Sequence, residues 1–321
     1  MAALDLSFGV IAFFAVLSLA ASIVNGGLGY GYSSLSTPLA LLVFANRIVN
    51  PAYVLLEAGI NTLMLFRSGG SNVRATYRRA LPVVLSLVPG VVLGSVVVSE
   101  VAPEWVRFGV YATILPLILL QAAGFRRPLK GETSAAVPVG VGVGLMYSIT
   151  TISGPPIALF WNNQGLKPRE FKAAVAQVRI AESYLACLSY YLLGLFGAQS
   201  LSLFKVIAPP VLVGVPVGMF VATMVAAETF RRVCMAFDAG IVGYGLSVVL
   251  PTLLGVGAAV AQSLFVAVLA VDAGLLYRYL KERPMVAAGA TGALDPGGGL
   301  AGGSTPDAGE GDPHPGPETY S

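Results

Sequence analysis

Two interruptions of the hydrophobic chain combine glycine with hydroxyl residues, and both have the chemistry of an anion site. Residues 25–34 read Asn-Gly-Gly-Leu-Gly-Tyr-Gly-Tyr-Ser-Ser, and residues 147–154 read Tyr-Ser-Ile-Thr-Thr-Ile-Ser-Gly. Glycine permits a sharp turn, and a helix that starts after the turn presents free N–H groups and the positive end of its dipole. Such a helix end binds a small oxyanion without needing a lysine. The residues expected to bind a substrate here are Asn25, Gly29, Gly31, Ser33, Ser34, Tyr147, Ser148, Thr150, Thr151, Ser153 and Gly154.

Three charged residues inside apolar segments form the second group with functional chemistry. Placing such a side chain at the centre of a membrane helix costs roughly 2.5–3.5 kcal/mol of free energy when it is charged and unpaired. Each therefore needs a partner or a water-filled cavity. Arg179 lies about 10 Å along its helix from Lys172, and Glu182 follows on the same face. We expect Arg179 to bind an anion and Glu182 to orient Arg179, with a purely structural Arg179–Glu182 pair as the alternative. Glu57 lies in the equivalent region of the first half, where it either carries a coupling proton or pairs with Arg179.

The sequence offers little for enzymatic chemistry. Its one histidine, His314, lies in a Pro/Gly-rich tail, which argues against a His-based metal site or a Ser-His-Asp triad in the hydrophobic body. The Gly27-Leu28-Gly29 segment lacks the third glycine of a dinucleotide-binding turn, and no phosphate-binding Gly-Lys-Ser/Thr loop occurs. Cys187 and Cys234 lie in apolar runs and are interpreted as packing residues. We therefore expect no catalytic residues, no metal and no cofactor.

The composition indicates where these residues must be held. Of the 321 residues, 56% are hydrophobic and 11% are charged, against roughly 25% charged residues in soluble domains. This excludes a soluble enzyme and predicts an all-α polytopic transmembrane helical bundle. The net charge of +3 is too small to indicate a nucleic-acid partner. Helices are predicted near 8–24, 33–45, 51–66, 80–99, 105–122, 137–152, 155–163, 171–197, 205–226, 231–250 and 255–277, of which 33–45 and 155–163 are short enough to be half-helices or re-entrant segments.

The chain repeats itself. The segment after the first interruption, Ser-Thr-Pro-Leu-Ala-Leu at 36–41, resembles Gly-Pro-Pro-Ile-Ala-Leu at 154–159, and similar matches continue through both halves. Residues 8–122 and 137–250 are thus predicted to be two copies of a five-helix unit, followed by an extra helix at 255–277. Because five is odd, the second copy enters the membrane from the opposite side, as in transporters built from inverted repeats with broken helices.

Charge and composition also predict the topology and the tail. The loops at 67–79, 123–136, 164–172, 227–232 and 278–283 are rich in Lys and Arg, whereas the alternate loops are not, which places the first set in the cytoplasm. Residues 1–283 then form the transmembrane domain. Residues 284–321 are rich in glycine and proline, and their charged residues are all acidic, with no Lys or Arg. We therefore expect a disordered cytoplasmic tail.

The repeated pattern of a glycine-containing turn, a small and polar stretch and a proline resembles the TauE/SafE family of sulfite exporters. The basic loop after the third segment and the Pro/Gly-containing fourth segment share this resemblance, which extends over about 8–250. The first turn has a tyrosine among its glycines, and the second, Ser153-Gly154-Pro155-Pro156, has few glycines. The resemblance implies a multi-pass permease for sulfite, a sulfonate or a related small organic anion.

These observations lead to one functional prediction and its alternatives. We expect a permease of the cell membrane that moves a small anion by alternating access, with the two interruptions and Arg179 forming the binding region and Glu57 and Glu182 serving in coupling. Its partners are a small anionic substrate and the lipid bilayer, and a homo-oligomer is left open. The alternatives are a membrane enzyme acting on lipid and a membrane scaffold without transport, in which the small residues only allow close helix packing.

Overall fold

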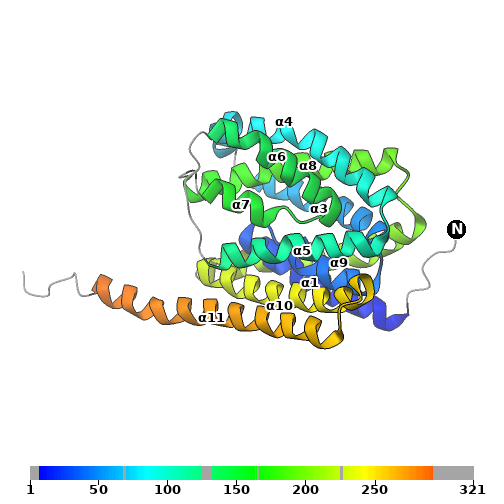
Figure 1. Cartoon of the computed structure of the whole chain (residues 1–321). Helices are drawn as coiled ribbons and strands as arrows, with labels where there is room; N and C mark the ends of the chain where they lie inside the picture. Colours follow the sequence, from blue (N-terminus) through cyan, green and yellow to red (C-terminus); the bar gives the residue numbers. More distant parts are fainter. Residues whose placement is uncertain are drawn as a thin grey trace, which may run out of the picture. The chain divides into compact units, whose positions relative to one another are not determined.

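The computed structural model describes residues 7–67, 70–123, 132–162, 164, 166–224 and 227–291, and this part of the chain is all-helical. It divides into two units, Met1–Arg278 and Tyr279–Ser321, and the following concerns the first. The described helices are α1 (Phe8–Leu28), α2 (Tyr32–Val43), α3 (Asn46–Arg67), α4 (Gly70–Glu100), α5 (Pro103–Ala122), α6 (Glu132–Thr150), α7 (Gly154–Asn162), α8 (Pro168–Leu192), α9 (Ala198–Met224), α10 (Ala227–Leu254) and α11 (Ala258–Thr291) (Figure 1).

Each helical segment expected from the sequence corresponds to one of these helices, and the differences lie at the ends. α4 begins at Gly70 rather than near 80, and α9 begins at Ala198 rather than near 205. The extra residues of α4 include Arg74, Arg78 and Arg79, and because arginine is a good helix former the helix continues through this charged stretch. The extra residues of α9, 198–204, contain no charge. α11 continues past Pro284 to Thr291, further than the predicted end at 277, and the rest of the predicted tail lies outside the described residues.

The helices fall into long and short classes. Seven described helices are long and apolar enough to cross a membrane: α1, α3, α4, α5, α9, α10 and α11. α2 has 12 residues and α7 has 9, so they extend only about 18 Å and 14 Å at 1.5 Å per residue. A hydrocarbon core of about 30 Å is too thick for either helix alone. α2 follows the long helix α1, and α7 follows the 19-residue helix α6, each after an interruption, as expected for broken helices.

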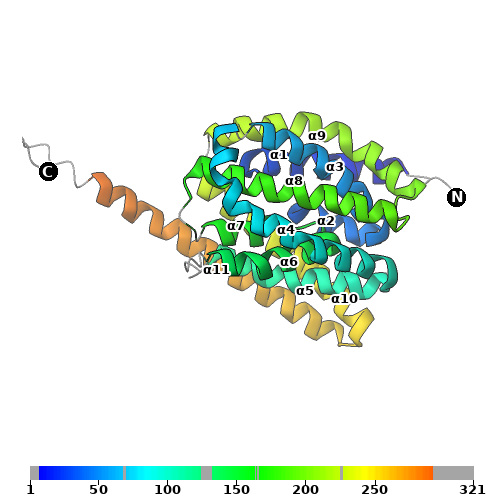
Figure 2. The same cartoon turned by 90° about the horizontal axis from the view of Figure 1, so that it is seen from above.

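The packing of the first five helices is matched by the packing of the next five. α1 lies along α9 and α6 lies along α4, while α3 packs on α9 and α8 packs on α4 (Figures 1 and 2). α5 pairs with α10, and α3 pairs with α8. If α1–α5 are matched in order to α6–α10, each of the contacts just named corresponds to another of them or to itself. This is the pattern that two related units produce, and their inversion across the membrane stays a prediction.

Glycine allows the closest of these helix pairs to form. A Cβ atom at Gly144 of α6 would lie 2.5 Å from the carbonyl oxygen of Leu87 on α4. A Cβ at Gly26 of α1 would likewise overlap the carbonyl of Val215 on α9. In a membrane, helices associate mainly through such close van der Waals contact. The glycines of these long helices therefore hold the scaffold together.

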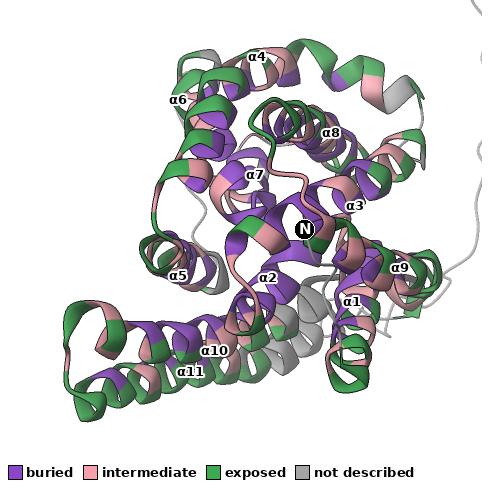
Figure 3. Cartoon of the chain, turned by 90° about the vertical axis from the view of Figure 1, so that its right-hand side faces the viewer, coloured by how far each residue is buried: buried purple, intermediate pink, exposed green. Residues whose placement is uncertain are grey.

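The short helices lie inside the bundle formed by the long ones. Figure 3 shows that α2 and α7 are mostly buried, whereas the outer faces of α4, α9 and α11 are exposed. Two clusters of buried apolar residues surround them, one containing Phe14, Tyr53 and Tyr111 and the other containing Tyr147 and Trp161. The two interruptions that precede α2 and α7 are consequently held at the centre of the packed helices.

Candidate functional site

The first interruption separates α1 from α2. Gly29 and Gly31 have φ angles of 82° and 108°, a region that side-chain-bearing residues rarely adopt. The N–H of Gly29 donates to the carbonyl of Asn25 at 2.8 Å, which closes α1, and the carbonyl of Gly31 accepts the first helical bond of α2. The glycines thus allow α1 to end and α2 to start within three residues.

A carboxyl group lies at the start of α2. Ser33, in the first turn of α2, donates a hydrogen bond to Oε1 of Glu57 on α3. Both residues are buried, and Glu57 is 0% exposed. The N-terminal end of a helix carries a partial positive charge, which favours a negatively charged group at this position. The place where the sequence predicted a substrate anion therefore holds a carboxyl group of the protein itself.

The second interruption repeats this arrangement with different residues. α6 ends at Thr150, and Thr151 has a φ angle of 58°, which is unusual for a β-branched residue. Ser153 precedes α7, and its carbonyl accepts the first helical bond from the N–H of Ile157 at 3.1 Å. The Ser153 hydroxyl donates to Oε1 of Glu182 on α8. Each half of the molecule thus places one serine and one glutamate at the start of its short helix.

Side chains from α3 and α8 bond to the carbonyl groups at the end of α6. Asn50 Nδ2 donates to the carbonyl of Ile149 at 2.7 Å, and the Tyr190 hydroxyl donates to the carbonyl of Ser148. The last carbonyls of a helix have no partner within the helix, so these bonds satisfy polar groups that would otherwise be costly in a buried setting. The second interruption is therefore held from both sides.

The two interruptions lie against each other. The hydroxyl oxygens of Thr37 on α2 and Thr151 are 2.9 Å apart. A Cβ atom at Gly154 would lie 3.1 Å from Cγ of Tyr30, so the ring of the first interruption packs on the backbone of the second. Segments far apart in the sequence thus form one continuous region between the two short helices.

Arg179 pairs with the glutamate of the other half. Its Nη2 lies 3.0 Å from Oε1 of Glu57, and the two side chains are 3% and 0% exposed. Asn61, one turn beyond Glu57, donates to the carbonyl of Arg179 at 3.2 Å. Of the two partners considered from the sequence, the structure brings Glu57 into the ion pair, while Glu182 accepts the hydrogen bond of Ser153.

Several polar atoms around this ion pair have no hydrogen-bond partner in the described part of the chain. They are Arg179 Nε, Glu57 Oε2 and Glu182 Oε2, and all three are buried. Tyr147, also fully buried, lies within electrostatic reach of the same three side chains. Because buried polar groups are nearly always bonded, such a group of unsatisfied atoms marks a place for water or for a polar ligand.

Other predicted residues are used differently. The Ser148 hydroxyl donates to the carbonyl of Val91 on α4 at 3.0 Å, and Ser34 is buried in the first turns of α2. Asn25 is buried in the last turn of α1, and neither of its amide atoms has a partner among the described residues.

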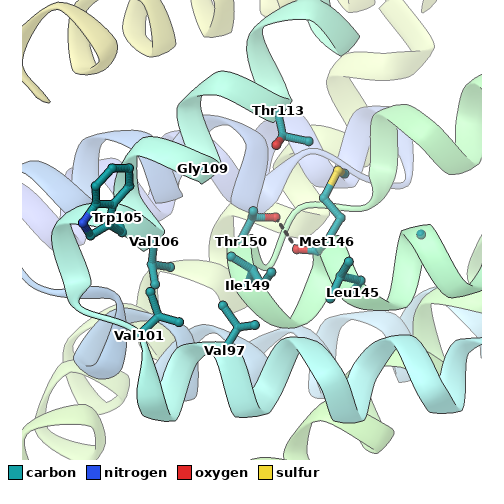
Figure 4. Close-up of a pocket in the computed structure, with 11 residues that line it drawn as sticks. Val97, Val101, Trp105, Val106, Gly109, Thr113, Leu145, Met146, Ile149 and Thr150 are labelled. Carbon is teal, nitrogen blue, oxygen red and sulfur yellow. Dashed lines mark hydrogen bonds between the residues drawn. The ribbon is translucent and has the colours of Figure 1, made fainter. Parts of the chain in front are cut away.

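Thr150 lies beside an apolar cavity. Its hydroxyl donates to the carbonyl of Met146 at 2.7 Å, and both residues line a cavity of about 260 Å³ between α4, α5 and α6 (Figure 4). The opposite wall includes Trp105 and Thr113 of α5. The Thr150 hydroxyl also accepts a hydrogen bond from the N–H of Ile152 at 2.9 Å, so it connects the end of α6 with the second interruption at the margin of the central region.

Thr37 and Asn61 join the candidate site although they were not selected as site residues from the sequence. Thr37 follows Ser33 by four residues on a helix, so helical periodicity places the two hydroxyls on one face. That signal was available in the sequence. No sequence signal connects Thr37 with Thr151, because this contact depends on how the two halves pack.

The comparisons with known proteins gave one match. The model of the family described as "Sulfite exporter TauE/SafE" matches residues 14–239. The matched range runs from α1 into α10 and includes both interruptions, Glu57, Arg179 and Glu182. No curated protein and no solved structure matched the chain.

Proposed function

The chain belongs to the sulfite exporter TauE/SafE family, a family of membrane transporters, and on this basis we propose that it carries sulfite, a sulfonate or a related small organic anion across the cell membrane. The multi-pass helical architecture agrees with membrane transport, and the family is one of transporters rather than enzymes. The substrate within this class, its route and its coupling are the proposed parts. The single observation that supports the route most strongly is the contact between the two interruptions beside the buried Arg179.

The proposed anion site is the position that Glu57 now occupies. Oε1 of Glu57 accepts hydrogen bonds from the Ser33 hydroxyl and from the Arg179 guanidinium at the same time. These donors, at the start of a helix, are the groups that bind a small oxyanion. In this proposal, the carboxylate of Glu57 holds the place that the substrate anion takes. Ser153 and Thr151 supply further hydroxyl groups from the second half.

Alternating access would follow from the two related five-helix units. Each unit presents one short helix to the central site, and the hydroxyl contact between Thr37 and Thr151 connects them. If the units are inverted as the odd helix number predicts, movement of one unit against the other would open the site to each side in turn. The excess of basic residues in alternate loops supports a cytoplasmic location for the C-terminal tail.

The test is a flux assay with the purified protein in liposomes, using radiolabelled sulfite with sulfoacetate, thiosulfate and acetate as comparison anions. We expect Arg179→Ala to reduce the initial rate about a hundredfold, which corresponds to the roughly 3 kcal/mol typical of truncating a buried charged partner. Arg169→Ala is the matched control, because Arg169 is an exposed arginine on the same helix. It should transport at the wild-type rate.

Removing Arg179 alone leaves Glu57 as an unpaired buried carboxylate, which can unfold the protein. The double variant Arg179→Ala/Glu57→Gln avoids this charge and should be well folded but equally inactive. A wild-type rate in the folded double variant would overturn the role of Arg179. Absence of flux for all four anions with the wild-type protein would overturn the proposed function.

A further inference from the structure

The charges of the buried site do not balance when all its groups are ionised. Glu57 and Glu182 are 0% exposed and Arg179 is 2% exposed, so two negative charges would accompany one positive charge away from water. An uncompensated buried charge costs several kcal/mol, and two neighbouring carboxylates avoid it when one of them binds a proton. The site in its present form therefore contains one protonated carboxyl group.

The contacts identify which carboxyl group holds that proton. Glu57 Oε1 lies 3.0 Å from Arg179 Nη2, an ion pair that stabilises the ionised form of Glu57. Glu182 lies within electrostatic reach of Arg179 but forms no ion pair with it. Its Oε1 accepts the hydrogen bond of the uncharged Ser153 hydroxyl, and its Oε2 has no described partner. Glu182 is consequently the neutral member, and the resting site consists of a neutral carboxylic acid beside a balanced ion pair.

An arriving anion changes this balance, because it adds a second negative charge for the one guanidinium. We propose that Glu57 gives up Arg179 to the anion and takes up a proton in exchange, so that one proton crosses the membrane with each monovalent anion; this rests on the proposed function. The carboxylate of Glu57 becomes a carboxylic acid with a proton from water on the side where the anion enters. On the other side the anion leaves, the proton returns to water and the ion pair forms again.

The surroundings of Glu57 suit this exchange. Its Oε2 is buried and has no described hydrogen-bond partner, so it is free to bind a proton. Titratable groups from several helices interact electrostatically with Glu57. They include Tyr32 from α2, Tyr53 from its own helix, Tyr147 from α6, and Arg179 and Glu182 from α8. Arg179 is the cation that contacts Glu57, so an anion that binds Arg179 leaves the Glu57 carboxyl group without its charged partner.

The experiment uses methanesulfonate and sulfite in liposomes containing the full-length protein. Methanesulfonate stays a monovalent anion between pH 6 and 8, so any coupled proton must travel on the protein. With the outside one pH unit more acidic, the wild type should accumulate methanesulfonate up to about tenfold, the limit for one proton per anion. Because this exchange carries no net charge, an imposed membrane potential should leave the accumulation unchanged.

Glu57→Gln mimics the protonated side chain permanently. It should still exchange labelled for unlabelled methanesulfonate at equal concentrations, but it should no longer accumulate the anion in response to the pH gradient. Glu182→Gln should keep the roughly tenfold accumulation, whatever its rate, because Glu182 stays neutral throughout. Glu104→Gln, an exposed carboxyl change on α5, is the matched control.

The outcomes separate the two proposals. If the wild type moves the anions but a pH gradient drives no accumulation, the proton inference fails and the proposed transport function stands. Accumulation by Glu57→Gln, or its loss in Glu182→Gln alone, would also overturn the assignment to Glu57. If the wild type moves neither anion, the transport function fails and this inference fails with it.

Discussion

The two interruptions have the same layout but different chemistry. In the first, glycines provide the left-handed backbone, and the serine–glutamate pair also contacts an arginine. In the second, Thr151 adopts the left-handed conformation, and the glutamate of the serine–glutamate pair forms no ion pair among the described residues. The comparison shows how related halves can hold equivalent carboxyl groups in different surroundings. The position of one arginine, on α8 of the second half, creates the asymmetry.

Removing each glutamate should expose this difference most clearly. Glu57→Ala leaves Arg179 as a buried unpaired cation, so we expect it to lower the free energy of unfolding by about 3–5 kcal/mol. Glu182→Ala loses a hydrogen bond to a neutral hydroxyl and should cost only about 1–3 kcal/mol. Denaturant unfolding in detergent micelles measures both values. Equal losses in the two variants would show that Glu182 also takes part in an ion pair.

Substitutions in the backbone of the two interruptions should lower stability to different degrees. Gly31→Ala places a side chain at a φ angle of 108° and within 3.1 Å of Val24 Cγ1, so we expect a loss of about 1–3 kcal/mol. Thr151→Gly relieves an unfavourable conformation at 58° and should cost less than Gly31→Ala, although it removes a hydroxyl contact.

The control for the backbone pair is Gly59→Ala, since a Cβ at this helical position meets no atom within 4 Å. Alanine should there be neutral or stabilise α3 by up to about 1 kcal/mol. Thermal unfolding of Gly31→Ala, Thr151→Gly and Gly59→Ala in one detergent ranks the three variants by their loss of stability. A larger loss for Thr151→Gly than for Gly31→Ala would contradict the difference between the two interruptions.

The smallest expected effect concerns the contact that joins the two halves. Thr37→Val and Thr151→Val each remove one hydroxyl of the pair 2.9 Å apart, and each should cost about 0.5–1.5 kcal/mol. The double variant should cost less than the sum, because the second substitution removes a group that has already lost its partner. Unfolding measurements on this cycle give the coupling energy, and additive losses would mean that the two hydroxyls do not interact.

Much of the fold followed from the sequence. Hydropathy located all the described helices because backbone groups in the bilayer must bond within their own segment, which leaves a long apolar stretch little choice but a helix. The glycines at 29 and 31 indicated the first interruption, and the small number of charged residues in apolar segments drew attention to Arg179, Glu57 and Glu182. The helix ends were less accurate, since a helix outside the hydrocarbon region tolerates charge.

By itself the sequence determined the membrane class, the helices and the family resemblance, since these depend on local composition and on order along the chain. It also required Arg179 to have a partner, because a buried charge alone is too costly. The tertiary structure alone decided that this partner is Glu57 on α3 and not the nearby Glu182, and that Thr37 contacts Thr151. The reason is geometric: helical spacing permits the local pair, but the packing of α3 on α8 and of one interruption on the other brings distant atoms within bonding distance.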